Sequence, residues 1–366
     1  MPGVPSVLEE LHSACAAATA AGGDVTIDAD AAAALAARLE PGEVRAAAKG
    51  GFPIKFDTLE AELTFLALYH LLDFGGEFDD QLRAAVGRDA RETMQFGALG
   101  LHLGAKRLDR HFLKDFSAFS VSNYFGFEGR VDSELQPGIT ISKPGPLQPL
   151  AEAVRAAVNG AGAALEREGQ RTLGGHILAF ADARRQAGEP ALAAAFVADL
   201  AAAFPGYDDV AAVGATRLPF HRKAQALAAD LCARFGTPSQ QAGDGGEGEE
   251  GEPRQPGGGD ARFAWEDAAR LAGDSGSHAA AAWHELGVVR LPEALAAAVK
   301  EGLPLTGDDE ARVRAAAVAA ADAVAAAAGG AVTAAQLGAW AAGQLEEGGQ
   351  LRGKVKGHVA PGTTAY

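Results

Sequence analysis

The stretch from Leu218 to Leu231 places two cations and an imidazole at the start of an otherwise apolar helix. Positive charge at a helix start opposes the helix dipole, so Arg222 and Lys223 are expected to have a compensating partner. An arginine here can bind a phosphate through two parallel hydrogen bonds, which a lysine cannot do. The stretch is therefore compatible with a site for a small anionic ligand. The alternative is an ordinary basic first turn.

The composition of the chain predicts an all-α fold. Its 366 residues can bury a large core and could form one large domain or two smaller ones. Hydrophobic residues make up 48% of the chain but aromatic residues only 7%, and alanine supplies much of the difference. This pattern favours helices that pack through small residues over sheets of branched side chains. The net charge of −16 argues against direct binding to nucleic acid.

The sequence contains no pattern that calls for a metal or a cofactor. Two cysteines, Cys15 and Cys232, cannot build a disulfide framework or a four-thiolate zinc site. Phosphate-binding P-loops, zinc-binding His-Glu-x-x-His motifs and nucleophile elbows are absent from the sequence, and the nine histidines are scattered. No stretch is apolar enough for a membrane span, and the start lacks the charge pattern of a secretory signal. We expect a cytoplasmic protein without metal or cofactor, with an organelle address left open.

Helix start and stop signals recur roughly every twenty to thirty residues, which is typical of a compact multi-helix fold. Asp57 to Glu60 reads as a capping box, with Asp57 as the cap, and Gly75-Gly76 as the end of that helix. The segment from Gln136 to Pro146 is expected to be an extended crossing stiffened by proline. Further helices are expected over Arg88 to Gly104, Leu147 to Glu168, Thr172 to Arg185 and Ala191 to Phe204, the last stopped by Pro205-Gly206.

The segment near 237–260 differs in composition from the rest of the chain. It is rich in Gly, Glu, Gln and Pro and nearly empty of apolar residues. Such a segment cannot bury enough surface to offset the entropy lost on ordering. We therefore expect a flexible surface insertion rather than a domain boundary.

Four blocks of the sequence resemble the queuosine salvage family, whose members are helical proteins that hydrolyse queuosine 5′-phosphate to release the base queuine. The stretch after Pro219 is similar to the family's "FYKRAQ…ADL" signature, with the order of the two basic residues exchanged. An earlier block is similar to the family's N-terminal segment, which ends in a "LNFGSGYR"-like turn. The blocks are Phe52 to Gly75, Pro144 to Leu150, Leu218 to Phe235 and Leu286 to Val289.

The resemblance implies the organisation of the chain and its reaction. Residues 51–366 would form a queuosine-salvage-like helical domain that resembles the helix-hairpin-helix DNA glycosylases, preceded by an N-terminal helical extension over 1–50. The expected activity is that of an N-glycosyl hydrolase, which supplies queuine for tRNA modification. Its partner would be the small nucleotide substrate, without direct nucleic-acid or membrane binding. The oligomeric state stays open.

The resemblance also implies a catalytic aspartate. Cleavage of a glycosidic bond builds positive charge on the ribose, so a carboxylate must stabilise that state and orient a water molecule. The family's aspartate precedes a motif similar to Leu286-Gly287-Val288, and Asp274 matches it if two residues are inserted between the aspartate and that motif. Collinear alignment places Gly276 there instead. Of the two cations, Arg222 is expected to face the pocket and clamp the phosphate, with Lys223 facing solvent.

The remaining expected site residues would bind the base and the sugar. Aromatic faces and carboxylates are suited to a planar heterocycle with donor edges. Each of these side chains could equally belong to the core. The expected substrate-binding residues are Asp73, Phe74, Phe220, His221, Trp265 and Asp267, beside the catalytic set Asp274, Arg222 and Lys223.

Two departures from the family pattern support a second interpretation. Gln336 stands where the family's "DxxLW" motif has its aspartate, and the segment from Gly357 to Tyr366 lacks the family's arginines. The chain could therefore be a catalytically decayed member that binds a nucleoside or base, or serves as a scaffold. A third interpretation, a nucleic-acid glycosylase, is disfavoured by the net charge and the lack of a basic stripe.

Overall fold

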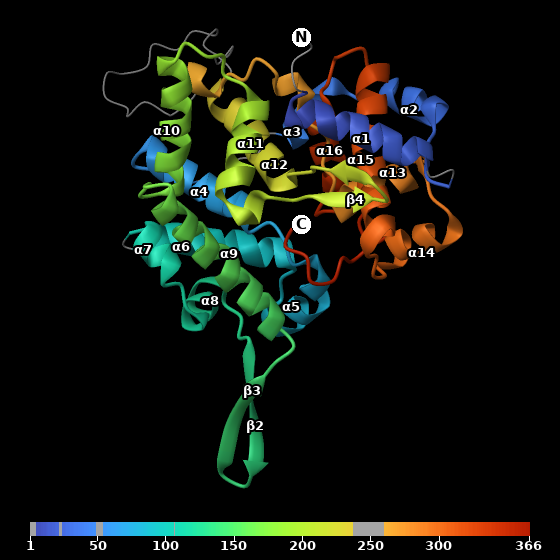
Figure 1. Ribbon diagram of the computed structural model, residues 1–366. Helices are drawn as coiled ribbons and strands as arrows, with labels where there is room; N and C mark the ends of the chain where they lie inside the picture. The colour runs from blue at the N-terminus through green and yellow to red at the C-terminus, as the bar shows by residue number, and fades with distance from the viewer. Residues whose placement is uncertain (1–4, 22–23, 49–53, 106, 237–259) are drawn as a thin grey trace, which may run out of the picture.

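The computed structural model describes residues 5–21, 24–48, 54–105, 107–236 and 260–366. Helices dominate these residues and pack into one body, from which a β-hairpin projects (Figure 1). The expectation of a mostly helical chain is confirmed. The strands among these residues form three small two-stranded sheets, which pair β1 with β6, β2 with β3 and β4 with β5.

The elements follow one another along the whole described chain. The helices are α1 (Val7–Ala21), α2 (Ala29–Ala36), α3 (Pro41–Ala47), α4 (Leu59–Leu71), α5 (Asp79–Val86), α6 (Ala90–Gly104), α7 (Arg110–Lys114), α8 (Ala118–Phe125), α9 (Gln148–Arg167), α10 (Leu173–Gln186), α11 (Ala193–Ala203), α12 (Arg222–Leu231), α13 (Ser277–Glu285), α14 (Glu293–Glu301), α15 (Gly307–Ala327) and α16 (Ala334–Gly343). The strands are β1 (Thr26–Ile27), β2 (Arg130–Gln136), β3 (Ile139–Pro144), β4 (Ala211–Val213), β5 (Thr216–Leu218) and β6 (Val289–Arg290).

The four helices predicted after residue 87 are confirmed as α6, α9, α10 and α11, with ends that differ by one or two residues. The predicted cap of α4 is wrong by one residue. Thr58, not Asp57, is the N-cap, and its hydroxyl accepts a hydrogen bond from the Ala61 amide at 3.1 Å. Glu60 accepts a hydrogen bond from the Thr172 hydroxyl at 2.5 Å instead of returning to the cap, so it joins α4 to α10.

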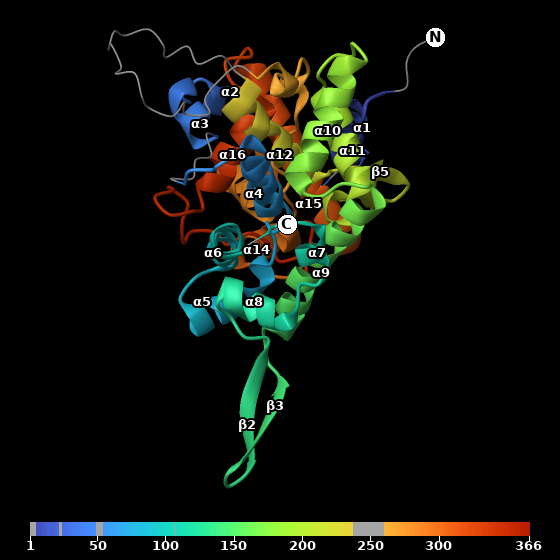
Figure 2. The ribbon, with the colours of Figure 1, turned by 90° about the vertical axis from the view of Figure 1, so that its left-hand side faces the viewer.

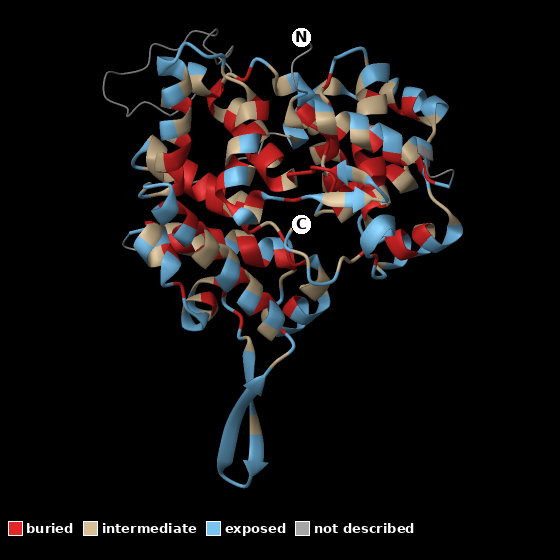
Figure 3. Cartoon of the chain, in the orientation of Figure 1, coloured by how far each residue is buried: buried red, intermediate tan, exposed pale blue. Residues whose placement is uncertain are grey.

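The segment around Pro137 forms an antiparallel hairpin, not an extended crossing. Strands β2 and β3 pair from Arg130 opposite Pro144 to Gln136 opposite Ile139. Gly138 closes the turn with a φ of 78°, a left-handed conformation that favours glycine. Both views show that the hairpin points away from the helical body (Figure 1 and Figure 2), and its residues are almost all exposed (Figure 3).

The N-terminal helices pack onto the C-terminal ones. Helices α1 and α2 both contact α15, α3 contacts α16, and β1 pairs with β6. The buried apolar residues among those described divide into a large cluster centred on α4, α6 and α9 to α12, a second centred on α13, α15 and α16, and a small third one between α1 and α15. Buried positions line the interior faces of both groups of helices (Figure 3). Residues 1–50 thus contribute helices to the second cluster.

The predicted insertion near 237–260 lies outside the described residues except for Asp260. Its two flanks are joined directly, because the Asp260 amide donates a hydrogen bond to the Phe235 carbonyl at 2.9 Å. Deleting Gln240 to Gly259 would leave residues 237–239 to connect these flanks. We expect the melting temperature to stay within about 5 °C of wild type, because shortening a polar loop between fixed ends costs little. A larger fall in a thermal melt would show that the segment contributes to the packed structure.

Candidate active site

A cluster of ion pairs forms where three distant parts of the chain meet. Arg222 is the first residue of α12, Asp73 follows α4, and Asp274 lies in the loop before α13. The Arg222 Nε and Nη2 atoms donate to the Asp274 carboxylate at 2.6 and 3.3 Å. Its Nη1 atom lies 2.8 Å from Asp73 Oδ2. The expected anionic partner of the basic helix start is thus a pair of carboxylates.

The start of α12 depends on an unusual backbone conformation at His221. Among the described residues, His221 is the one non-glycine residue with a positive φ, at 40°. Such a conformation is strained and persists only when its surroundings hold it. Asp209 supplies that support, because its carbonyl accepts a hydrogen bond from the His221 amide at 2.9 Å and its amide donates to His221 Nδ1 at 3.3 Å. This turn brings the chain from β5 into α12 and directs Arg222 toward the carboxylates.

Asp274 and Gly276, the two candidates for the catalytic position, both border the Arg222 side chain. The Gly276 amide donates to Asp274 Oδ1 at 2.7 Å. A Cβ atom on Gly276 would lie 3.0 Å from Arg222 Nε and 3.1 Å from Asp274 Oδ1, so position 276 faces the same ion pair. The carboxylate that contacts Arg222 therefore comes from residue 274, and Gly276 leaves space for it.

Both carboxylates are held ionised. Burial alone would raise the pKa of Asp274, but the Arg222 guanidinium and the Gly276 amide outweigh it and hold the pKa below its usual range. Burial likewise opposes ionisation of Asp73, and the charges of Arg222, Arg91 and Lys223 lower its pKa well below the ordinary value. The carboxylates of this cluster are therefore negative at neutral pH.

Lys223 is buried, so the expectation that it faces solvent is wrong. Its side chain is 2% exposed, and its Nζ atom donates to the Leu71 carbonyl at 2.7 Å. The ammonium lies 4.5 Å from the centre of the Phe74 ring, which places Phe74 beneath it. Burial lowers the pKa of Lys223 to about 7, although Asp73 opposes the shift. Lys223 thus binds the carbonyl of the last residue of α4, next to the ion cluster.

Gln225 gives the Asp274 loop a second attachment to α12. Its side-chain amide donates to the Phe220 carbonyl at 2.7 Å, and its oxygen accepts from the Ala272 amide at 2.8 Å. The side chain is buried, so both hydrogen bonds are shielded from water. This residue of the basic stretch therefore fixes the loop and does not face a ligand.

Four other expected site residues have structural contacts. Phe220 is 1% exposed, and the buried His221 supports the turn described above. Trp265 stacks on Phe196 and donates from its indole nitrogen to the Ala228 carbonyl at 2.9 Å. Asp267 caps α11 by accepting from the Ala193 and Ala194 amides at 2.6 and 3.0 Å. None of the described contacts joins Trp265 or Asp267 to the ion cluster.

The structure adds three ionisable residues that sequence reasoning missed. Arg91 at the start of α6 forms an ion pair with Glu346, which follows α16. Burial raises the pKa of Glu346 despite Arg91, with Asp73 and Asp274 acting in the same direction as burial. Burial, followed by the charge of Arg91, lowers the pKa of His278 at the start of α13. No local motif marks these residues, because their partners lie far away in the sequence.

The cluster suits a developing positive charge better than a second anion. The side chains of Asp73, Arg222 and Asp274 are 32%, 13% and 19% exposed, so solvent reaches the cluster. Two carboxylates on one guanidinium leave a net negative charge when the buried lysine is neutral. A phosphate at Arg222 would have to compete with both carboxylates. The phosphate clamp therefore stays a prediction, and the contacts seen assign Arg222 to holding Asp274.

Helix α16 supports the Asp274 loop through a close backbone approach. A Cβ atom on Gly338 would lie 2.0 Å from the Asp274 amide nitrogen, whereas one on Gly343 of the same helix would meet nothing within 4 Å. Gly338→Ala is therefore expected to displace the loop and lower the free energy of unfolding by about 1–3 kcal/mol. Gly343→Ala is the matched control, expected to stabilise the helix by up to about 1 kcal/mol. Urea unfolding of both variants tests this, and equal stabilities would contradict it.

Comparison of the chain with models of protein families and with curated proteins gave no match. Among the described residues, no group of three or more His, Cys, Asp or Glu side chains is placed to hold a metal ion. The helices of that part of the chain include none long and apolar enough to cross a membrane. The ion cluster of Asp73, Arg222 and Asp274, taken with the sequence resemblance, is thus what a functional assignment rests on.

Proposed function

We propose that the protein hydrolyses the N-glycosidic bond of queuosine 5′-phosphate and releases queuine for tRNA modification. The observation that carries this proposal is the contact of Arg222 with Asp73 and Asp274. These residues come from two separate blocks of the resemblance and from the expected catalytic loop. If the resemblance had arisen by chance, the matched residues of distant blocks would not be expected to contact one another. The similarity to helix-hairpin-helix glycosylases and a cytoplasmic location belong to the same proposal.

The proposed chemistry follows from the charges of the cluster. The Asp274 carboxylate stabilises the positive charge that develops on the ribose and orients the attacking water. As the bond from the ribose to the base breaks, the hydroxyl of the water bonds to the ribose, and the remaining proton passes through Asp274 to the departing base. Arg222 keeps this carboxylate ionised and fixes its direction. The reaction as proposed needs the small nucleotide substrate and no metal or cofactor.

A second function, binding of the nucleoside or base without cleavage, has two observations in its favour. Arg222 already pairs with both carboxylates, and the expected base-binding residues Phe220 and Trp265 are buried at 1% and 5% exposure. A pocket that has lost its activity would keep such a packed core. In this proposal the ion cluster stabilises the fold, and the chain binds queuine or acts as a scaffold.

Incubation of the purified protein with queuosine 5′-phosphate distinguishes the two functions. Release of queuine, detected by chromatography and mass spectrometry, supports hydrolysis. Queuosine without the phosphate is the matched substrate, and it shows whether the phosphate contributes to recognition. Binding of queuine in calorimetry without cleavage of either substrate would favour the second function. If the protein neither cleaves these substrates nor binds queuine, both proposed functions are refuted.

A further inference from the structure

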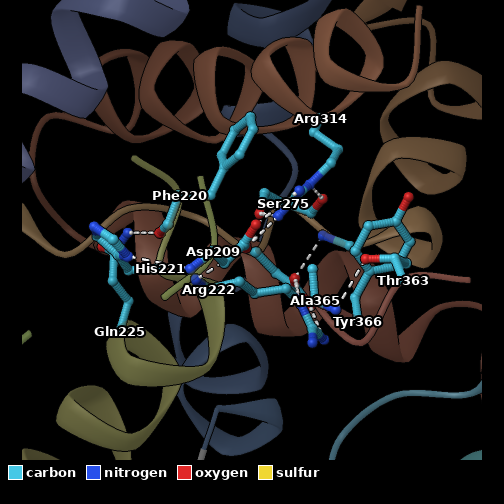
Figure 4. A network of polar contacts seen from close by, with 12 residues as sticks. Asp209, Phe220, His221, Arg222, Gln225, Ser275, Arg314, Thr363, Ala365 and Tyr366 are labelled. Carbon is cyan, nitrogen blue, oxygen red and sulfur yellow. Dashed lines mark hydrogen bonds and ion pairs between the residues drawn. The ribbon is translucent and has the colours of Figure 1, made fainter. Parts of the chain in front are cut away.

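Arg314 lies deep in the molecule beside the candidate active site. It is on α15 and is 2% exposed. Its guanidinium carbon is 4.0 Å from the centre of the Phe220 ring and 4.9 Å from that of Tyr366 (Figure 4). An arginine held between two aromatic faces has little freedom to reorient. Nothing in the local sequence, which is mostly alanine, marks this residue.

The Arg314 guanidinium joins two segments that carry the ion cluster. Its Nη1 and Nη2 atoms donate to the Asp209 carboxylate, the first at 3.0 Å. Its Nε atom donates to the Ser275 carbonyl at 3.2 Å, and Nη2 also donates to the Ser275 hydroxyl at 3.3 Å. Figure 4 shows Asp209 and Ser275 on either side of this contact. One rigid group therefore fixes both segments at once.

Each of the two segments leads directly to a member of the ion pair. Ser275 is the residue after Asp274. Asp209 Oδ2 accepts from the Arg222 amide at 3.4 Å, and Asp209 holds the strained turn at His221 through its backbone. A shift of Arg314 would thus move the Asp274 backbone relative to the start of α12.

The C-terminal segment holds Arg314 from its other side. The Tyr366 hydroxyl donates to Glu310 Oε1 at 2.7 Å and contacts His358 Nε2 at 2.9 Å. Glu310 lies one helical turn before Arg314, with 3.6 Å between Glu310 Oε1 and Arg314 Nη1. These contacts form a closed network around a buried cation, as a precisely oriented group requires.

We infer that Arg314 is a positioning residue, which sets the geometry of the Asp274–Arg222 pair through Ser275 and Asp209. Its consequence for catalysis rests on the proposed hydrolysis. A lysine would keep the buried positive charge opposite Asp209. It lacks the planar fork that reaches Asp209 and Ser275 together. Arg314→Lys therefore keeps the buried positive charge but removes the hydrogen bonds that reach Asp209 and Ser275 together.

The kinetic test compares Arg314→Lys with Arg312→Lys, the same change on the same helix at a more exposed position. We expect Arg314→Lys to lower kcat by at least about 10-fold and change KM by less than about 3-fold. Arg312→Lys should leave both constants near wild type. In an Asp274→Asn background, Arg314→Lys should lower kcat by less than about 3-fold further, because its effect passes through Asp274. Equal losses in both backgrounds would overturn the inference.

Amide hydrogen exchange of residues 272–277 gives a readout that does not need activity. Arg314→Lys should increase the exchange rate of this loop by at least about 5-fold, while Arg312→Lys leaves it unchanged. Ser275→Ala, which removes one acceptor of Arg314, serves if Arg314→Lys fails to fold, and it should increase exchange in the same loop. Unchanged exchange in the folded variants would overturn the inference. If wild type does not cleave the substrate, the proposed function fails, and exchange alone decides the role of Arg314.

Discussion

The Asp274→Asn variant is expected to lower kcat for hydrolysis of queuosine 5′-phosphate by at least about 100-fold. The asparagine keeps the size of the side chain and can still accept hydrogen bonds from Arg222 and Gly276. It removes the negative charge that would stabilise the ribose as its bond to the base breaks. An interaction made mainly in the transition state should change kcat far more than KM. Steady-state kinetics of queuine release measures both constants.

Asp267→Asn is the matched control for this variant. Asp267 is an acid expected from the sequence to bind the substrate, and in the structure its carboxylate accepts hydrogen bonds from the first two amides of α11. Asparagine keeps an acceptor oxygen for only one of these two amides, but the change lies away from the ion cluster, so kcat should stay within about 3-fold of wild type. If Asp274→Asn keeps wild-type activity and Asp267→Asn loses it, the assignment of the catalytic acid is wrong. A thermal melt of each variant shows whether a loss reflects unfolding.

The helices could be predicted because their signals are local. Pro205 and Gly206 stop α11, as expected of residues that do not continue a helix. The sequence also predicted that the cations at the start of α12 have a compensating partner, because positive charge at a helix N-terminus is unfavourable on its own. Arg222 has that partner in Asp73 and Asp274. Local rules thus predicted α6 and α9 to α11, and the sign of the charge that pairs with the start of α12.

The direction of each side chain was not predictable in the same way. Whether Arg222 or Lys223 faces the carboxylates depends on where α12 begins, and that depends on the positive φ of His221. Successive residues of a helix point about 100° apart, so the position of its first residue decides which side chain is buried. The support for His221 comes from Asp209, and no sequence spacing reveals it. The role of Arg314 could not be predicted for the same reason, since its partners Asp209 and Ser275 are distant in the sequence.

The buried Lys223 should make the stability of the protein depend on pH. Its ammonium has one hydrogen bond, to the Leu71 carbonyl, and is otherwise removed from water. Burial lowers the pKa of Lys223 to about 7, from an ordinary lysine value of 10.5. Between these two values the unfolded chain binds the proton and the folded chain releases it. The free energy of unfolding therefore rises with pH in this window.

Lys223→Met should remove this part of the pH dependence. Between about pH 7 and about pH 9, the lysine contributes a rise of roughly 2 kcal/mol in the free energy of unfolding, which the variant lacks. Near pH 7 the variant should be no less stable than wild type, because methionine fills a buried space without a charge to desolvate. Urea unfolding at several pH values measures the difference in slope, with Lys300→Met as the control at an exposed lysine. A variant with the wild-type slope would show that Lys223 keeps its proton, and thus its positive charge, in the folded protein.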